Sequence, residues 1–381
     1  MSPPLRPADS PAPATWRGIL HRFVQVAGGY WWGEQPRVAW GVALALLTLN
    51  AAEVSLLLRF NQWHRDLFDA LERRDAHEVL LECGFLLLLV ACFAGVSCLH
   101  LQARRRLALG WRAWLAQRLT GAWLAKGAGM TAAGEANADG RIAEDARIAT
   151  EEAVELASSF SHGLMMLTIF VGVLWALSDH DPISLGGITF ALPGYLLWIA
   201  VLYAGAGMAI AALLGRPLVR STDHRQAVEA EYRAALVRSR DNRQAATRQD
   251  QVLSGLFGQV AAVFHHQTRA FANLQLFCVG NTRLGSGLPF LAATPAYLAG
   301  VVTLGWVMQA AQAFQHVASA LTWPVDHMPR IATWRASAER VIALHDAALP
   351  QAALAGLPMP VPQDAGVTRS PAGAADVAAS S

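Results

Sequence analysis

The chain has 381 residues, of which 54% are hydrophobic and 15% are charged. A soluble globular domain carries about 25% charged residues, so this composition excludes an ordinary soluble domain. The formal net charge of +2 excludes nothing by itself, but the charges are unevenly distributed along the chain.

The N-terminal region has two parts. Residues 1–13 are rich in Pro, Ala and Ser and are predicted to be disordered. Residues 14–33 place apolar side chains at helical spacing and end in aromatic side chains, which favour a membrane–water interface. These side chains are Trp16, Ile19, Leu20, Phe23, Tyr30, Trp31 and Trp32. The pattern predicts an interfacial elbow helix over residues 14–33 that leads into a membrane.

Five apolar tracts make up much of the remaining chain. They are Val38–Leu58, Val79–Leu101, Leu156–Leu177, Leu192–Leu214 and Leu284–Val325. Each of the first four has about 20 residues, the length that a helix needs to cross the ~30 Å hydrocarbon core of a bilayer. The fifth contains no Asp, Glu, Lys or Arg and is long enough for two crossings, with a natural turn at Pro295 and Gly300. The sequence predicts an all-α membrane protein with six transmembrane helices in residues 34–346.

The basic residues indicate how the chain is oriented. They concentrate before the first tract, between the second and third, and between the fourth and fifth, and Ser178–Ala191 has none. Because cytoplasmic loops are enriched in Lys and Arg, both termini and the two long loops are predicted to be cytoplasmic. The first outer loop departs from this rule, although its arginines are roughly balanced by carboxylates. Topology accounts for the arginine clusters, so membrane lipid rather than nucleic acid is the expected partner.

The two long loops are helical in composition. A glycine-rich stretch, Lys126–Gly140, interrupts the first loop, and the second, Arg216–Arg269, has no proline after Pro217. The transmembrane helices that flank these loops are predicted to continue tens of ångströms into the cytoplasm as paired stalks. Residues 347–381 lack periodicity and are predicted to form a disordered tail.

Patterns for enzyme and metal chemistry are missing from the sequence. There is no GxxxxGK[ST] motif, so neither a nucleotide-binding domain nor ATP hydrolysis by the chain itself is expected. The 12 histidines include no HExxH or HxH motif, and the 4 cysteines include no CxxC pair. We therefore expect no metal ion and no cofactor.

Ionisable and polar groups inside the apolar tracts are the best functional candidates, because they are costly there and tend to face a cavity or a partner. Those considered are Asn50, Glu53, Glu78, Glu82, His162, Arg283, His316 and Asp326. Asn50 lies one turn before Glu53, and Glu78 and Glu82 share one face of a helix.

Three interpretations of these groups remain open. Glu53 and Glu82, followed by Asp326, are the preferred proton carriers, because a buried carboxyl group holds its proton more tightly than an exposed one. Alternatively the groups line a hydrated cavity or form an ion pair, for example between Glu53 and Arg283, that holds helices in register. In the third interpretation the spans are misplaced, and Glu78 and Asp326 face water.

Short segments spread in order over residues 30–345 carry a resemblance. They are Asn61–Trp63, Leu67–Leu71, Trp111–Leu115, Arg141–Asp145, Gly215–Leu218, Glu229–Arg233, Leu304–Gly305, Met308–Gln309, Ala313–Phe314 and Trp334–Ala336. Together they resemble the transmembrane half of peroxisomal and bacterial subfamily-D ABC transporters. Within this group the chain resembles the SbmA/BacA-like inner-membrane proteins, which have no nucleotide-binding domain, and their ATPase-fused cousins.

The resemblance implies a membrane domain of the ABC-exporter (type 1) fold in a bacterial inner membrane. It also implies a homodimer that imports peptides or similar bulky solutes with the energy of the proton gradient. One stretch departs from the ATPase-bearing relatives: Arg240–Thr247 lacks the glutamate and the Gly-Glu pair of their second inner loop, which disfavours docking of an ATPase.

The first half of the chain is nevertheless more similar to the ATPase-fused group. The alternative is therefore the membrane subunit of an ABC transporter whose ATPase is a separate polypeptide, docking at Lys126–Gly140 and Arg238–Asp250. A third interpretation is a membrane scaffold or a fragment of a fused transporter.

Overall fold

A computed structural model describes residues 16–33, 36–126, 138–178, 183–185, 188–190, 193–241 and 246–352. The chain divides into two units. Unit 1 comprises the described residues within Met1–Pro36, Leu109–Thr150 and Trp334–Ser381, and unit 2 those within Arg37–Ala108 and Glu151–Thr333. The predicted disordered N-terminus and most of the glycine-rich loop lie outside the described residues.

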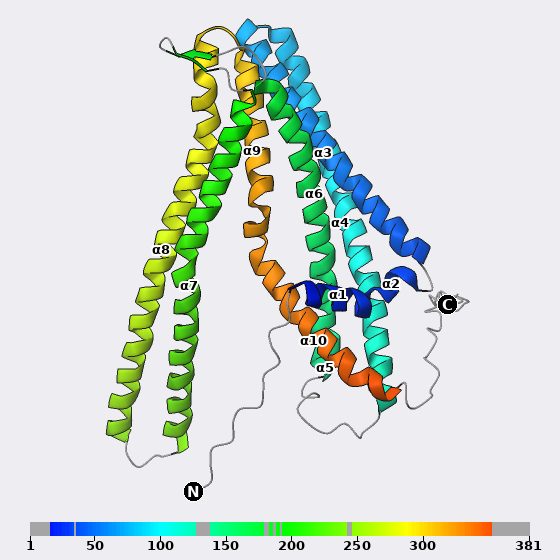
Figure 1. Cartoon of the computed structure of the whole chain (residues 1–381), viewed down its shortest axis with the longest axis vertical. Helices are drawn as coiled ribbons and strands as arrows, with labels where there is room; N and C mark the ends of the chain where they lie inside the picture. The colour runs from blue at the N-terminus through cyan, green and yellow to red at the C-terminus, as the bar shows by residue number, and fades with distance from the viewer. Residues whose placement is uncertain are drawn as a thin grey trace, which may run out of the picture. The chain divides into compact units, whose positions relative to one another are not determined.

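Almost all of the described chain is helical, which confirms the predicted all-α class (Figure 1). The helices are α1 (Trp16–Ala27), α2 (Gly29–Trp32), α3 (Pro36–Arg73), α4 (Ala76–Lys126), α5 (Ala138–Gly140), the π-helical turn Arg141–Asp145, α6 (Ala146–Ser178), α7 (Tyr195–Asp241), α8 (Ala246–Leu298), α9 (Leu304–Asp326) and α10 (Met328–Ala352). Strands β1 (Ile183–Leu185) and β2 (Ile188–Phe190) form a short antiparallel hairpin between α6 and α7. Helix α10 includes residues 347–352, so the first part of the predicted tail is helical.

Four helices are long and apolar enough to cross a membrane by length and composition. These spans are Pro36–Arg73, Ala76–Leu124, Ala138–Ser178 and Tyr195–Arg216. The last two predicted crossings correspond to the end of α8 and to α9, on either side of Gly300, whose φ is +71°. Gln309, Gln312 and His316 make α9 more polar than the other spans, so the count of six crossings stays a prediction.

Several helices are much longer than a bilayer requires. Helices α4, α7 and α8 have 51, 47 and 53 residues. At 1.5 Å per residue each is about 70–80 Å long, more than twice the thickness of the hydrocarbon core. Helices α7 and α8 pair along their length (Figure 1): the Tyr203 hydroxyl donates to the Asn281 carbonyl at 2.8 Å, and the Tyr232 and Phe257 rings lie 5.8 Å apart.

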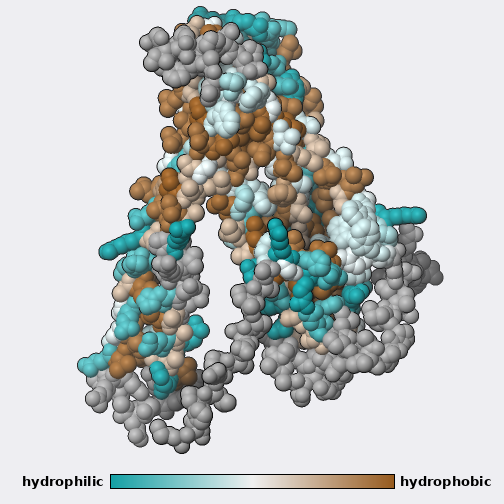
Figure 2. Space-filling view, in the orientation of Figure 1, coloured by the Kyte–Doolittle hydropathy of each residue, from teal (hydrophilic) through white to brown (hydrophobic). Residues whose placement is uncertain are grey.

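Helix α9 is the centre of the apolar core of unit 2. Its residues Phe314 and Val317 are fully buried against Phe170 and Leu174 of α6 and Leu196 of α7. Figure 2 shows hydrophobic side chains gathered in this part of unit 2 and hydrophilic ones at the turn between α3 and α4. Most side chains of α9 between Gly305 and Ala318 are buried or half-buried. A helix covered in this way needs little lipid-facing apolar surface, which explains why α9 tolerates glutamines.

Carboxylates from α3 hold the start of α9. Asp69 accepts a hydrogen bond from the Gly305 amide at 3.0 Å, and Glu72 accepts one from the Leu304 amide at 2.9 Å. Negative charge is favourable at a helix N-terminus, where the amides have no partner within the helix. A side chain at position 305 would overlap the Arg65 carbonyl and the Asp69 carboxylate, so glycine is required by this close approach.

Unit 1 is built around aromatic side chains. Phe23 of α1 contacts Trp111 and Trp334, with ring centroids 5.9 Å and 5.3 Å away. The Trp111 indole donates to the Ala27 carbonyl at 2.9 Å, and Arg22 pairs with Asp346. Helices α1 and α2 thus occupy the predicted elbow segment, and their apolar side packs within the unit. Their placement at a membrane interface stays a prediction.

Candidate functional site

Glu53 lies on α3 where α4 and α6 pack against it. Its Oε1 is 3.3 Å from His100 Nδ1, and its Oε2 is 3.7 Å from His162 Nδ1. Both are electrostatic contacts, and the contact with His100 is the closer of the two. The three side chains are 15%, 13% and 27% exposed, so they are largely removed from solvent. Glu53, His100 and His162 are called the Glu53 cluster below.

Asn50 fixes the helices around this cluster. Its amide nitrogen donates to the Ser161 hydroxyl at 2.8 Å and to the Ser158 carbonyl at 3.3 Å. The Ser158 hydroxyl is 3.0 Å from His100 Nε2, so α3, α4 and α6 are joined through one set of polar groups. Asn50 therefore joins α3 to α6 beside the cluster, and its amide is not a titratable group.

A second set of charged side chains begins with Glu155, which lies one helical turn before Ser158 on α6. Glu155 pairs with Arg104 at 2.6 Å and with Arg330 at 3.2 Å, and Glu152 pairs with Arg330 at 2.8 Å. Burial disfavours the charge of Arg330, but the hydrogen bonds that its guanidinium donates to Glu152 and Glu155 outweigh burial and raise the pKa of Arg330. Arg104, Glu152, Glu155 and Arg330 are called the Glu155 network.

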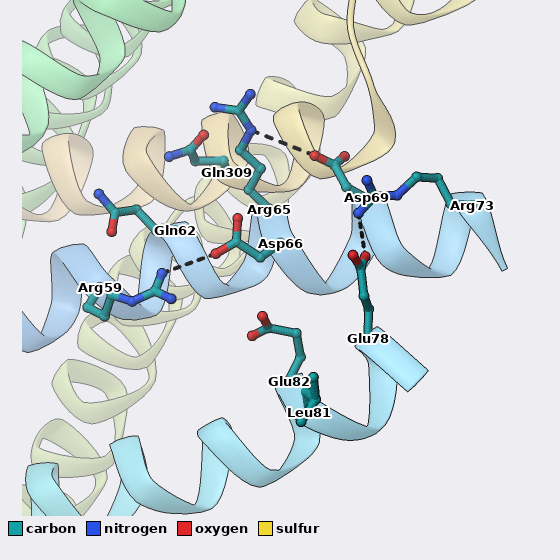
Figure 3. A pocket seen from close by; sticks show the side chains of 10 residues that line it. All are labelled: Arg59, Gln62, Arg65, Asp66, Asp69, Arg73, Glu78, Leu81, Glu82 and Gln309. Atoms are coloured by element: carbon teal, nitrogen blue, oxygen red, sulfur yellow. Dashed lines mark hydrogen bonds and ion pairs between the residues drawn. The ribbon is translucent and has the colours of Figure 1, made fainter. Parts of the chain in front are cut away.

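A pocket of about 750 Å³ lies between the ends of α3, α4 and α9 (Figure 3). It is lined by Arg59, Gln62, Arg65, Asp66, Asp69, Arg73, Glu78, Leu81, Glu82 and Gln309. Most of its charges are paired, as in the contacts Arg59–Asp66 at 3.1 Å and Arg73–Glu78 at 2.6 Å.

Glu82 is the exception in this pocket. Figure 3 shows its carboxylate directed into the space between α3 and α4, toward Asp66. Its Oε2 is buried and has no hydrogen bond among the described residues. Glu78 and Glu82 line the same pocket, in keeping with their four-residue spacing.

The remaining candidates lie apart from the Glu53 cluster. Arg283 is exposed on α8, and Asp326 is exposed at the end of α9, where it accepts a hydrogen bond from the Thr322 hydroxyl at 2.9 Å. The ion pair considered between Glu53 and Arg283 is not formed, because α4 and α6 flank α3 at this height and supply histidines to Glu53.

The sequence interpretation missed one member of the Glu53 cluster, His100. His100 stands near the end of an apolar tract, where it reads as an interfacial residue. The sequence signal for the Glu53 cluster was a carboxylate and several histidines in separate apolar tracts. Spacing along the chain does not reveal which of these tracts pack against one another in the fold. Among the described residues no group of His, Cys, Asp and Glu is arranged to hold a metal ion.

Long apolar helices with stalk-like extensions, and an ionisable cluster in their interior, define the membrane domain of a transporter. The model of the SbmA/BacA-like family matches residues 35–342, and the chain belongs to this family.

Three relatives are ABC proteins. The chain is 24% identical over 345 residues to the inner membrane ABC transporter ATP-binding protein YddA of Escherichia coli, covering 87% of this chain and 62% of the relative. It is 25% identical over 332 residues to the chloroplastic ABC transporter D family member 2 of Arabidopsis thaliana, and this match covers 85% of this chain and 45% of the relative. An uncharacterized ABC transporter ATP-binding protein of Synechocystis is 25% identical over 355 residues, and this match covers 87% of this chain and 50% of the relative. The chain thus spans between 45% and 62% of the length of these relatives.

Proposed function

We propose that the chain forms the membrane domain of a homodimeric importer that uses the proton gradient to take up peptides or similar bulky solutes. The protein lies in a bacterial inner membrane, with six crossings per protomer and both termini in the cytoplasm. The observation that carries this proposal is the Glu53 cluster, a carboxylate held between two imidazoles inside apolar helices.

The chemistry of the cluster suits proton coupling. A carboxylate and a neutral imidazole can both accept a proton, and charged groups inside a membrane are costly unless they are paired. Adding one proton to the cluster changes the attraction between Glu53 and the histidines. Because these side chains belong to α3, α4 and α6, a change in protonation alters how three helices are held together.

Exposed apolar surface supports both the membrane setting and the dimer. Only 6% of the most apolar window of α4 is buried within the chain. Leu80, Leu87 and Leu88 are therefore exposed, and lipid or a second copy covers them in the proposed assembly. A solute cavity between two protomers is wide enough for a bulky solute when the long stalks splay.

A second candidate function is the membrane half of an ATP-driven transporter. It is favoured by the printed names of the relatives, which are ABC transporter proteins longer than this chain. In this alternative an ATPase, on a separate polypeptide or in a longer form of the protein, supplies the energy.

The two candidates are distinguished by uptake of a labelled proline-rich peptide into liposomes containing the purified protein. Under the proposal, an imposed inward proton gradient drives accumulation without ATP, and a protonophore abolishes it. Accumulation that needs ATP and a partner ATPase, and ignores the gradient, would establish the second candidate and overturn the first.

Glu53→Gln tests the residue that carries the proposal. Glutamine keeps the size and polarity of the side chain but cannot take up a proton, so gradient-driven accumulation should fall by about tenfold or more. The exposed Glu231 on α7 provides a matched control, because Glu231→Gln should leave accumulation unchanged. Undiminished uptake by a folded Glu53→Gln protein would remove Glu53 from the coupling mechanism.

A further inference from the structure

We propose that each protomer contains a complete proton route, in which His64 and His316 connect the pocket at the ends of α3 and α4 to the Glu53 cluster. The route rests on the proposed function and specifies the path that protons take. All its members belong to unit 2.

The first step of the route is His64, both of whose ring nitrogens have a hydrogen-bond partner. Its Nδ1 lies 2.9 Å from the Phe60 carbonyl, and its Nε2 lies 3.0 Å from the amide nitrogen of Gln312. A carbonyl only accepts, so Nδ1 carries the proton and Nε2 accepts from Gln312. If His64 takes up a second proton, rotation of the Gln312 amide presents its oxygen to Nε2 instead. Either charge state of His64 can therefore be satisfied.

His64 lies next to the pocket. Gln309, which lines the pocket, is one turn from Gln312 on α9. The Gln309 carbonyl accepts a hydrogen bond from Asn61 at 2.9 Å, which holds α3 against α9 beside His64. The pocket is also lined by Glu82, whose buried Oε2 has no hydrogen bond among the described residues, so the pocket contains a proton acceptor.

His316 is the second step. It lies one turn beyond Gln312 on α9, and its ring packs against Phe170 with centroids 4.3 Å apart. Among the described residues, the titratable groups whose charges act on it are His162 from α6 and His64 from α3. No hydrogen bond to the His316 ring is found in the described part of the chain. An imidazole in such surroundings costs stability, so packing alone does not account for it.

From the Glu53 cluster the route continues toward the opposite end of unit 2. The Ser158 hydroxyl contacts His100, and Glu155 lies one turn from Ser158 on α6. Glu155 and its arginines form the inner end of the route. The order is pocket, His64, His316, His162, Glu53, His100 and the Glu155 network.

Each transfer moves one proton from a protonated imidazole or carboxylic acid to a lone pair of the next group. The donor returns to its neutral imidazole or carboxylate form, so the only net change is the movement of a proton. The proposed transfers require the His64 and His316 rings to rotate until neighbouring groups come within hydrogen-bond distance. Because every member of the route belongs to α3, α4, α6, α9 or α10 of one protomer, the proposed route is separate from a solute path between protomers.

The route is tested with His316→Phe, His316→Gln and His64→Phe, and with His266→Phe as control, since His266 is exposed on α8. Three quantities are measured in liposomes: accumulation of the labelled proline-rich peptide under a proton gradient, proton entry on peptide addition, and peptide exchange at equal pH and concentration on both sides. Exchange needs the solute path and the helix movements but no net proton transfer.

The expected result is a loss of about tenfold or more in accumulation and proton entry for the three route variants, with exchange within about twofold of the unchanged protein. His266→Phe should match the unchanged protein in all three measurements. Gradient-driven accumulation retained by His316→Gln would overturn the route while leaving the proposed function intact. Parallel loss of exchange and accumulation in every route variant would also overturn it, because the histidines would then serve structure or solute. Absence of gradient-driven accumulation in the unchanged protein would instead overturn the proposed function.

Discussion

The ion pair between Arg340 and Asp145 should make a measurable contribution to the stability of unit 1. Arg340 of α10 binds Asp145 through two hydrogen bonds, Nε to Oδ2 at 2.8 Å and Nη2 to Oδ1 at 2.6 Å. The Asp145 side chain is 10% exposed, whereas that of Arg340 is 47% exposed. The Asp145 carboxylate, which accepts both bonds, raises the pKa of Arg340 further above its ordinary value.

Arg340→Ala leaves the Asp145 carboxylate buried without its partner. Removing one member of a fully buried pair costs about 3–5 kcal/mol, and solvent at Arg340 reduces this to about 2–3 kcal/mol. Asp145→Ala removes the same interaction without leaving a buried charge. The protein that carries both Arg340→Ala and Asp145→Ala should therefore be about 1–2 kcal/mol more stable than the sum of the two single losses predicts.

The assay is denaturant unfolding in detergent, followed through tryptophan fluorescence, since Trp111 and Trp334 lie in the same unit. A matched control is Arg335, which pairs with Glu339 at 2.9 Å on the exposed side of α10. Arg335→Ala should cost about 0.5 kcal/mol or less. If Arg340→Ala costs no more than Arg335→Ala, the argument from burial of Asp145 is wrong.

Two further predictions concern packing and pH. Gly305→Ala should destabilise the protein by about 1–3 kcal/mol, because the added methyl group overlaps the Arg65 carbonyl. The control Gly280→Ala lies at an open helical position and should instead stabilise the protein by about 0.5–1 kcal/mol. Equal effects of the two substitutions in thermal unfolding would contradict this prediction. Burial, followed by the charge of Arg118, lowers the pKa of His345 below its ordinary value of 6.5, although Asp346 partly opposes the shift. The unfolded chain therefore binds more protons, so stability should fall as pH drops through about 6.5 toward the folded-state pKa. His345→Gln should flatten this part of the stability–pH curve, and an unchanged curve would exclude His345 as its source.

The apolar tracts predicted much of the fold because a membrane-crossing helix has a strong signature in sequence. The turn at Gly300 lies where the pattern indicated it, and the helices that flank the long loops do extend well beyond a bilayer. Helix α9 was harder to evaluate by hydropathy. Its Gln309, Gln312 and His316 face other helices rather than lipid, so a count based on apolar windows undervalues it.

The candidate site was predicted only in part. Glu53 was singled out because a carboxylate in an apolar tract is costly, and the structure places it among ionisable groups. Its partner could not be predicted, because which helices flank α3 is a tertiary property. Arg283 has the charge to pair with Glu53, yet α8 does not bring it there. The role of Asn50 in joining α3 to α6 likewise depends on Ser158 and Ser161, two serines that no sequence motif marks.

The polarity of α9 has a consequence for how the protein is made. A segment with several glutamines and a histidine partitions poorly into lipid by itself, whereas α3, α4 and the start of α7 enter readily. In the proposed six-crossing arrangement, stable insertion of α9 depends on helices synthesised earlier, which cover its polar groups and offer Asp69 and Glu72 to its first turn. The helices should accordingly insert in sequence, with α9 among the last to reach its final position. Substitutions in α3 that remove Asp69 or Glu72 should therefore appear first as failed membrane integration of α9.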